Sequence, residues 1–215
     1  MASMATQIRP AHEEMTSAAI LGAAATASIV GLAYLTTRAT PALGALALTS
    51  LSVYGASLVA AFATSALYHG AQCGRWRSIF QKIDHCTIFL LIAGTYTPVA
   101  MLPLRHHGGG VLLLSIWTLA LGGVGLRLFG ARLYDRVAVL LYLALGWLCL
   151  AWSVPLYQTV ATIPILLMLA GALSYTGGLL FYRWHRLPFS NSIWHLCVVA
   201  GSAWFFIAIT YLRPA

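Results

Sequence analysis

Seven long apolar segments most constrain what this chain can fold into. A helix needs about 20 apolar residues to cross the roughly 30 Å hydrocarbon core of a bilayer. Runs of about that length are separated by short polar stretches, at about residues 18–35, 43–69, 83–102, 111–129, 137–152, 161–182 and 192–212. Because lipid offers no hydrogen-bond partner to the backbone, such segments are helical. We therefore predict an all-α integral membrane protein, a bundle of seven transmembrane helices.

Composition excludes the other classes of protein. Sixty per cent of the 215 residues are hydrophobic and 7% are charged, against about 25% charged residues in a soluble domain. The formal net charge of +8 comes from basic residues scattered among the loops. They form no basic stripe and belong to no nucleic-acid-binding motif, so the charge does not indicate nucleic-acid binding.

The distribution of basic residues orients the bundle. If the N-terminus is cytoplasmic, nine basic residues lie on that side and three on the other. The nine are Arg9, Arg75, Arg77, Lys82, Arg127, Arg132, Arg136, Arg183 and Arg186, and the three are Arg38, Arg105 and Arg213. The positive-inside rule then predicts a cytoplasmic N-terminus and an external C-terminus. We interpret residues 1–14 as a cytoplasmic tail and residues 15–215 as a single seven-helix domain.

This orientation brings several polar residues to the cytoplasmic end of the bundle. His69 ends the second span, Asp84 opens the third, and Asn191 and His195 open the seventh. Ser65 shares a helix face with His69, as Asn191 does with His195, because both pairs are spaced i and i+4. Zinc is held by three or four such groups and can activate a water molecule. If these helices are neighbours, the pattern predicts a metal site near the inner leaflet.

Each of these residues also has a simpler interpretation. His69 and His195 can be interfacial histidines that are wet at one edge. Asp84 can cap the third helix, because a carboxylate suits a helix N-terminus. Ser65 can bond to a carbonyl of its own helix. His85 can face the lipid headgroups.

The motifs that carry these residues resemble a known family. The patterns are SALYH at residues 65–69, IDH followed by LIAGTYTP within residues 83–98, and IWHL followed by AGSAW within residues 193–204, together with the pair Glu13-Glu14. They resemble the bacterial haemolysin III branch of the progestin and adipoQ receptor superfamily, over about residues 13–212. The resemblance implies seven helices in the bacterial inner membrane and a zinc site near the inner leaflet.

The same resemblance assigns roles to residues of the site. His69 and His195 match metal ligands, Ser65 matches the serine one turn before the first ligand, and Asp84 matches the aspartate that holds a zinc-bound water. We therefore expect Asp84 and Ser65 to be catalytic, and His69, His195, Asp84 and Asn191 to surround the metal.

Asn191 departs from the family pattern, which usually has histidine at this position. Leu21 and Phe205 also stand where many bacterial members carry histidine. An amide oxygen is a weaker zinc ligand than an imidazole. Asp84 can then be a direct ligand, His185 or His85 can be recruited, or the metal can have been lost. We expect zinc binding that is weakened or altered.

Three functions follow from these observations. The wider superfamily is related to the alkaline ceramidases, so the resemblance implies a zinc-dependent hydrolase of a lipid amide or ester. The branch name suggests a cytolytic, pore-forming protein instead. Asn191 favours a third function, a lipid-sensing protein of membrane homeostasis without catalysis. In each case the expected partner is a membrane lipid, as substrate or ligand. The sequence is also compatible with a homo-oligomer.

Overall fold

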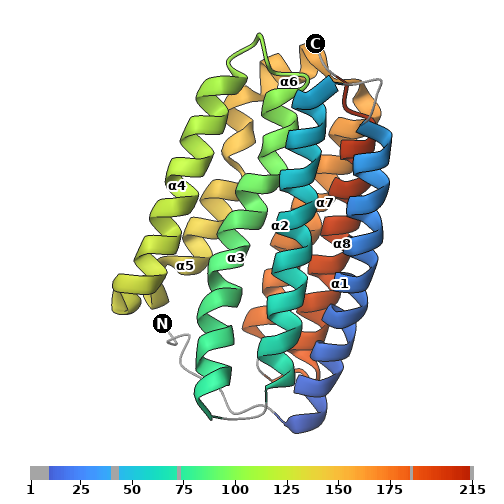
Figure 1. Ribbon diagram of the computed structural model, residues 1–215. Helices are drawn as coiled ribbons and strands as arrows, with labels where there is room; N and C mark the ends of the chain where they lie inside the picture. Colours follow the sequence, from blue (N-terminus) through green and yellow to red (C-terminus); the bar gives the residue numbers. More distant parts are fainter. Residues whose placement is uncertain (1–9, 40–43, 72–73, 185, 214–215) are drawn as a thin grey trace.

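The chain forms a bundle of long helices in the computed structural model, which describes residues 10–39, 44–71, 74–184 and 186–213 (Figure 1). The described elements are α1 (Ala11–Ala39), α2 (Gly44–Gly70), α3 (Gly74–Met101), α4 (Gly109–Phe129), α5 (Ala131–Gly146), the 3-10 helix η1 (Leu148–Trp152), α6 (Ser153–Thr159), α7 (Thr162–Arg183) and α8 (Ser190–Thr210). The described ranges contain no β-strand.

The prediction of an all-α bundle with seven spans is confirmed. Within the described ranges, seven helical segments are long and apolar enough to cross a bilayer. Large apolar side chains on their outer faces are exposed, as expected for contact with acyl chains; Leu114, Leu140 and Leu180 are each about 70% exposed. The fifth span, residues 132–159, is built from three pieces: α5, η1 and α6.

Tyr96 of α3 stabilises the break in this fifth span. Its hydroxyl donates to the carbonyl oxygens of Leu145 and Gly146, at 3.1 and 2.9 Å, and accepts from the backbone N–H of Cys149 at 2.8 Å. A change from α to 3-10 geometry frees backbone groups that are costly to leave unpaired in a membrane. The single tyrosine satisfies three of them.

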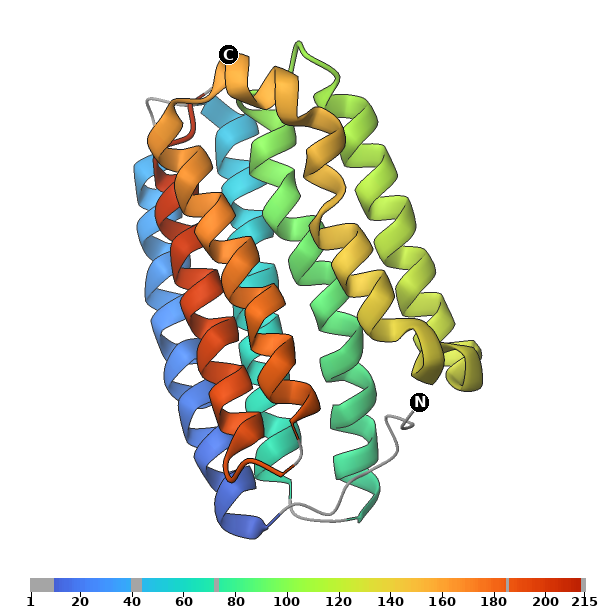
Figure 2. The ribbon, with the colours of Figure 1, turned by 180° about the vertical axis from the view of Figure 1, so that it is seen from behind.

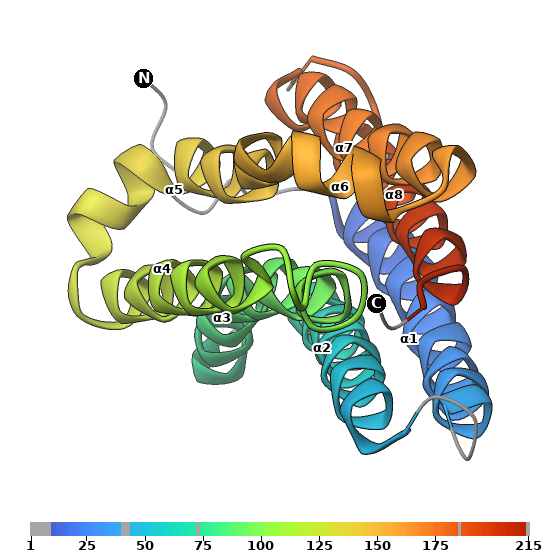
Figure 3. The ribbon, with the colours of Figure 1, turned by 90° about the horizontal axis from the view of Figure 1, so that it is seen from above.

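The helices follow one another around a closed circuit. From α1 to α5 each helix packs on the next, α7 packs on α8, and α8 returns to α1. The view along the bundle shows α6 lying across the end at which α7 begins (Figure 3). The reverse view shows α8 between α7 and α1 (Figure 2). The first helix is therefore held between α2 and the last helix, although α1 and α8 are far apart in sequence.

Two helices begin earlier than the apolar pattern predicts. α1 begins at Ala11 rather than near Ala18, immediately after Pro10, whose carbonyl oxygen accepts from the backbone N–H groups of Glu13 and Glu14. α3 begins at Gly74 rather than near Ile83, so Asp84 lies well inside it. The interpretation of Asp84 as a helix cap is wrong. Hydropathy marks where a helix enters hydrocarbon, and these helices continue through the polar interface.

Glycines allow α7 and α8 to approach closely, as small residues do between membrane helices. A Cβ atom placed on Gly171 would lie 3.0 Å from the carbonyl oxygen of Gly201 on α8. A Cβ on Gly178 would lie 2.7 Å from the Cβ of Cys197 and 2.8 Å from the ring of Trp194. The neighbouring Gly177 is exposed and has no such contact within 4 Å.

This difference between adjacent glycines gives a test of the α7–α8 interface. Gly178→Ala should lower the free energy of unfolding by about 1–3 kcal/mol, because the added methyl group overpacks the interface. Gly177→Ala, in the same helix, should leave stability unchanged or slightly raise it, because alanine favours helix. Unfolding of the purified variants in mixed detergent–SDS micelles measures both. Equal effects of the two substitutions would contradict this packing.

Candidate functional site

Two histidines from helices far apart in sequence meet at one end of the bundle. His69 lies in the last turn of α2 and His195 near the start of α8. Their Nε2 atoms are 3.0 Å apart, and their rings meet edge to face at 71°. Both side chains are buried, at 6% and 7% exposure. The structure thus brings together the two residues predicted to be metal ligands.

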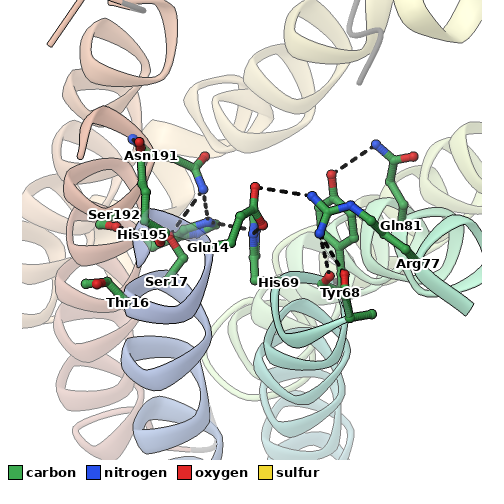
Figure 4. Close-up of polar contacts among 12 residues, drawn as sticks. Glu14, Thr16, Ser17, Tyr68, His69, Arg77, Gln81, Asn191, Ser192 and His195 are labelled. Carbon is green, nitrogen blue, oxygen red and sulfur yellow. Dashed lines mark hydrogen bonds and ion pairs between the residues drawn. The ribbon is translucent and has the colours of Figure 1, made fainter. Parts of the chain in front are cut away.

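A carboxylate of α1 fixes the orientation of the first histidine. Oε2 of Glu14 lies 2.8 Å from Nδ1 of His69 (Figure 4). A carboxylate in this position accepts the Nδ1 proton and leaves the Nε2 lone pair directed toward His195. Metal-ligating histidines almost always have such a partner on their second nitrogen.

Arg77 holds this carboxylate from the other side. Its Nη2 atom lies 3.2 Å from Oε1 of Glu14. The guanidinium stacks over the ring of Tyr68, 4.8 Å from its centroid, and donates to the carbonyl oxygen of Ala71 at 2.8 Å. Glu14 therefore ties α1 to α2 and α3 through two charged or chargeable partners, as a buried carboxylate requires.

Asn191 completes the group on the side of α8. Its amide Nδ2 lies 3.0 Å from Nε2 of His195 and 3.4 Å from the hydroxyl of Ser17. Its backbone N–H donates to Oε1 of Glu13 at 3.1 Å. The side chain is buried, at 4% exposure. Both glutamates of α1 thus take part in the site, one through α2 and the other through the start of α8.

Asp84 and Ser65 lie beside the histidine pair. Both are buried, at 8% and 7% exposure. The Ser65 hydroxyl lies near the Asp84 carboxylate, which is also within electrostatic range of His69. The two residues predicted to be catalytic therefore adjoin the predicted ligands. Their catalytic roles stay predictions.

Three other positions considered from the sequence, His85, Leu21 and Phe205, make contacts outside this group. His85 is turned toward α4, where its Nδ1 accepts from Arg127. His185 lies outside the described residues. Leu21 is a core residue at 1% exposure, and Phe205 stacks on Tyr175 with ring centroids 5.8 Å apart.

The hydrogen-bonding capacity of the group shows what it can bind. Nε2 of a neutral imidazole carries either one hydrogen or one in-plane lone pair. Nε2 of His195 nevertheless has two nitrogen neighbours at 3.0 Å, from His69 and Asn191. No single protonation state satisfies both contacts well. A cation would accept both imidazole lone pairs, and turning the Asn191 amide over would present its Oδ1 atom.

The acidic and sulfur-containing residues do not enlarge this donor set. Among the described residues, no group of three or more His, Cys, Asp and Glu side chains is arranged to hold a metal ion. The donors that converge are two imidazoles and one amide. They suit a borderline cation such as zinc, with one ligand weaker than a third imidazole would be.

Glu14 belongs to this group although the apolar pattern does not predict it. It precedes the apolar run, so the pattern assigns it to the cytoplasmic tail. A signal was available in the helical periodicity: Glu14, Ser17, Leu21, Ala24 and Ser28 recur at intervals of three and four residues, and all are buried. Extending the helix back to residue 11 would have placed Glu14 on the inner face of α1.

The fold and this buried polar group define a multi-pass membrane protein with a candidate site at one end of a seven-helix bundle. The family model described as haemolysin-III related matches residues 10–206. The chain belongs to this family. It is a multi-pass protein of the bacterial inner membrane.

Individual relatives match over most of their length. Hemolysin-3 of Bacillus cereus is 38% identical over 203 residues, covering 94% of this chain and 93% of the relative. The Hemolysin-3 homolog of Bacillus subtilis is 33% identical over 199 residues, covering 93% of each. The human monocyte to macrophage differentiation factor is 27% identical over 170 residues, covering 73% of this chain and 67% of the relative. No solved structure matches the chain.

The ion pair between Glu14 and Arg77 can be tested by a double-mutant cycle. Glu14→Gln and Arg77→Met should show a coupling energy of about 1 kcal/mol or more, because the two side chains are largely shielded from water. Arg75 is exposed on the same turn of α3, and Arg75→Met should show no coupling to Glu14→Gln. SDS unfolding of the six proteins measures both terms. A coupling near zero for Arg77 would contradict the ion pair.

Proposed function

We propose that this protein is a zinc-dependent hydrolase that cleaves an amide or ester bond of a membrane lipid. The observation that carries the proposal is the contact between His69 and His195, Nε2 to Nε2 at 3.0 Å, with Glu14 bonded to the other nitrogen of His69. Buried imidazoles at a membrane interface are costly unless they serve a purpose. The pairing with Glu14 is typical of a ligand held ready for a metal.

The zinc ion would be held by His69, His195 and the amide oxygen of Asn191, with Asp84 as the partner of a bound water. When bound, zinc polarises a carbonyl group and lowers the pKa of water to about 7. Glu14 keeps the proton of His69 on Nδ1, so that Nε2 remains a donor to the metal. Arg77 holds Glu14 in the position that does this.

Asp84 is the group that would move protons in this reaction. Its carboxylate is buried near the Ser65 hydroxyl. A positioned carboxylate can accept a proton from an attacking water and return it to the departing amine or alcohol. Ser65 acts as the residue that positions this base.

The position of the site favours a lipid as the substrate. Its residues lie at the ends of α1, α2 and α8 that the positive-inside rule places at the cytoplasmic face. The amide or ester bonds of membrane lipids lie at the boundary between headgroups and hydrocarbon. The polar site and the surrounding apolar helices therefore suit a substrate that presents its carbonyl at this depth.

Metal content tests the proposed zinc site. Wild-type protein purified with zinc and dialysed should retain the metal, and His69→Ala should lose it. Asn191→His should bind zinc at least about tenfold more tightly, because an imidazole replaces a weaker amide donor. His106→Ala is the matched control, since His106 is exposed in the α3–α4 connection at the other end of the bundle.

Zinc content can also contradict the proposed site. Less than a tenth of an equivalent of zinc in wild type, with no gain in Asn191→His, would overturn the zinc site. A deletion strain that nevertheless showed altered membrane lipids would then favour the lipid-sensing function without catalysis.

Activity tests the proposed reaction. Zinc-loaded protein in detergent micelles should release the fatty acid from a short-chain ceramide or a related lipid ester. Asp84→Asn should lower kcat by about 10²–10⁴-fold, the range for loss of a general base. Ser65→Ala should reduce kcat less, because the carboxylate remains. Retention of zinc without turnover of any lipid amide or ester in a broad panel would reject the hydrolase and leave the metal site standing.

The printed names of the two bacterial relatives suggest haemolysis as a second function. Dye release from liposomes separates the two proposals. A hydrolase needs Asp84, so any leakage that it caused would vanish in Asp84→Asn. A pore-former would release dye equally in wild type and in this variant, also in liposomes made of lipids without a cleavable amide or ester bond.

A further inference from the structure

A second buried polar group surrounds Arg127 in the last turn of α4. Arg127 is only 8% exposed. Its Nε donates to Nδ1 of His85 at 3.1 Å, and its guanidinium carbon lies 4.9 Å from the centroid of the Tyr134 ring. Arg127 is thus held between α3 and α5, away from the histidine pair.

The side chains around Arg127 are themselves held in place. Tyr134 is completely buried, and its hydroxyl lies 2.6 Å from that of Tyr142. Tyr142 in turn donates to the backbone carbonyl oxygen of His85 at 3.0 Å. Residues of α3, α4 and α5 therefore form a connected network that fixes the plane of the guanidinium.

This network gives Arg127 no counter-charge. Nδ1 of His85 accepts a hydrogen bond and so carries no proton, and the Tyr134 ring is neutral. The ion pairs found among the described residues both involve Glu14, and Arg127 has none there. Asp84, which precedes His85 in α3, forms no ion pair with Arg127 among the described residues. A buried cation without an anion is expensive in a membrane protein, so its persistence indicates a partner.

Two donor groups of Arg127 remain available to such a partner. Within the described part of the chain, Nε alone of its nitrogens makes a hydrogen bond. The one fully enclosed side-chain N or O atom without a partner in that part is the Tyr54 hydroxyl. Nη1 and Nη2 are therefore neither satisfied nor sealed off. They present the planar fork with which arginine binds phosphate and carboxylate oxygens.

We propose that Arg127 forms a binding site for a phosphate group at the cytoplasmic end of α4. Phosphate is the abundant anion at this depth, as the headgroup of the inner-leaflet phospholipids. Arg132 and Arg136 are exposed at the start of α5 and add positive charge that attracts anionic headgroups. The site uses none of the residues proposed to hold zinc. The proposal of a phosphate site therefore does not depend on the proposal of a hydrolase.

Lipid-dependent stability tests the proposal. Purified protein in neutral detergent is titrated with dioleoyl phosphatidylglycerol, dioleoyl phosphatidylcholine or inorganic phosphate, and the unfolding midpoint is recorded. Phosphatidylglycerol should raise the midpoint of wild type and of the control Arg75→Gln, which loses the same charge from an exposed position at the same end of the bundle. Arg127→Gln should require roughly tenfold or more phosphatidylglycerol for the same rise, because a charge-assisted hydrogen bond is lost.

The arms of the experiment identify the source of the phosphate. Stabilisation by phosphatidylglycerol alone indicates a lipid headgroup, and stabilisation by inorganic phosphate as well indicates a site open to free phosphate; both support the proposal when they depend on Arg127. Equal responses of wild type and Arg127→Gln would overturn it, since Arg127 would then serve only to stabilise the end of α4.

A second variant covers the case in which Arg127→Gln does not fold. Arg127→Lys keeps the charge but loses the planar fork, so it should still respond to phosphatidylglycerol, with an affinity lowered several-fold. A response of Arg127→Lys equal to that of wild type would contradict bidentate recognition of phosphate.

Discussion

The pairing of the buried Glu14 carboxylate with His69 and Arg77 is the interaction on which the histidine end of the bundle depends. Lipid and protein interior both penalise an isolated charge, so Glu14 must be paired wherever it is buried. Its two oxygens pair with His69 of α2 and Arg77 of α3. The same residue therefore joins three helices and sets the tautomer of a candidate metal ligand. The packing of the three helices and the orientation of His69 therefore depend on the same side chain, Glu14.

The buried charged and histidine side chains of the described residues are concentrated at one end of the bundle and fall into two groups. The first, around His69 and His195, brings together imidazole nitrogens that suit a cation. The second, around Arg127, presents a fixed guanidinium that suits an anion. Each group lies between neighbouring helices. α3 contributes Asp84 to the first group and His85 to the second. Asp84 and His85 are neighbours in sequence, but Asp84 belongs to the group that suits a cation and His85 to the group that suits an anion.

Hydropathy located the spans well but misplaced the residues at their ends. The apolar pattern reports where a helix meets hydrocarbon, whereas α1 and α3 extend through the interface into polar sequence. Asp84 therefore looked like a helix cap, and Glu14 looked like part of a tail. Both lie on inward faces. In a membrane protein the polar turns at the interface deserve the same test of helical periodicity as the apolar core.

The sequence alone determined the class of fold, the seven spans and their expected orientation, and the candidate residues Ser65, His69, Asp84, Asn191 and His195. These follow from local properties: segment length, apolar content, charge and i, i+4 spacing. The tertiary structure alone decided that the Nε2 atoms of His69 and His195 meet, that Glu14 bonds to His69, and that the buried Arg127 has no ion-pair partner among the described residues. Those facts depend on how side chains of α1, α2, α4 and α8 pack across helices distant in sequence, which no local pattern encodes.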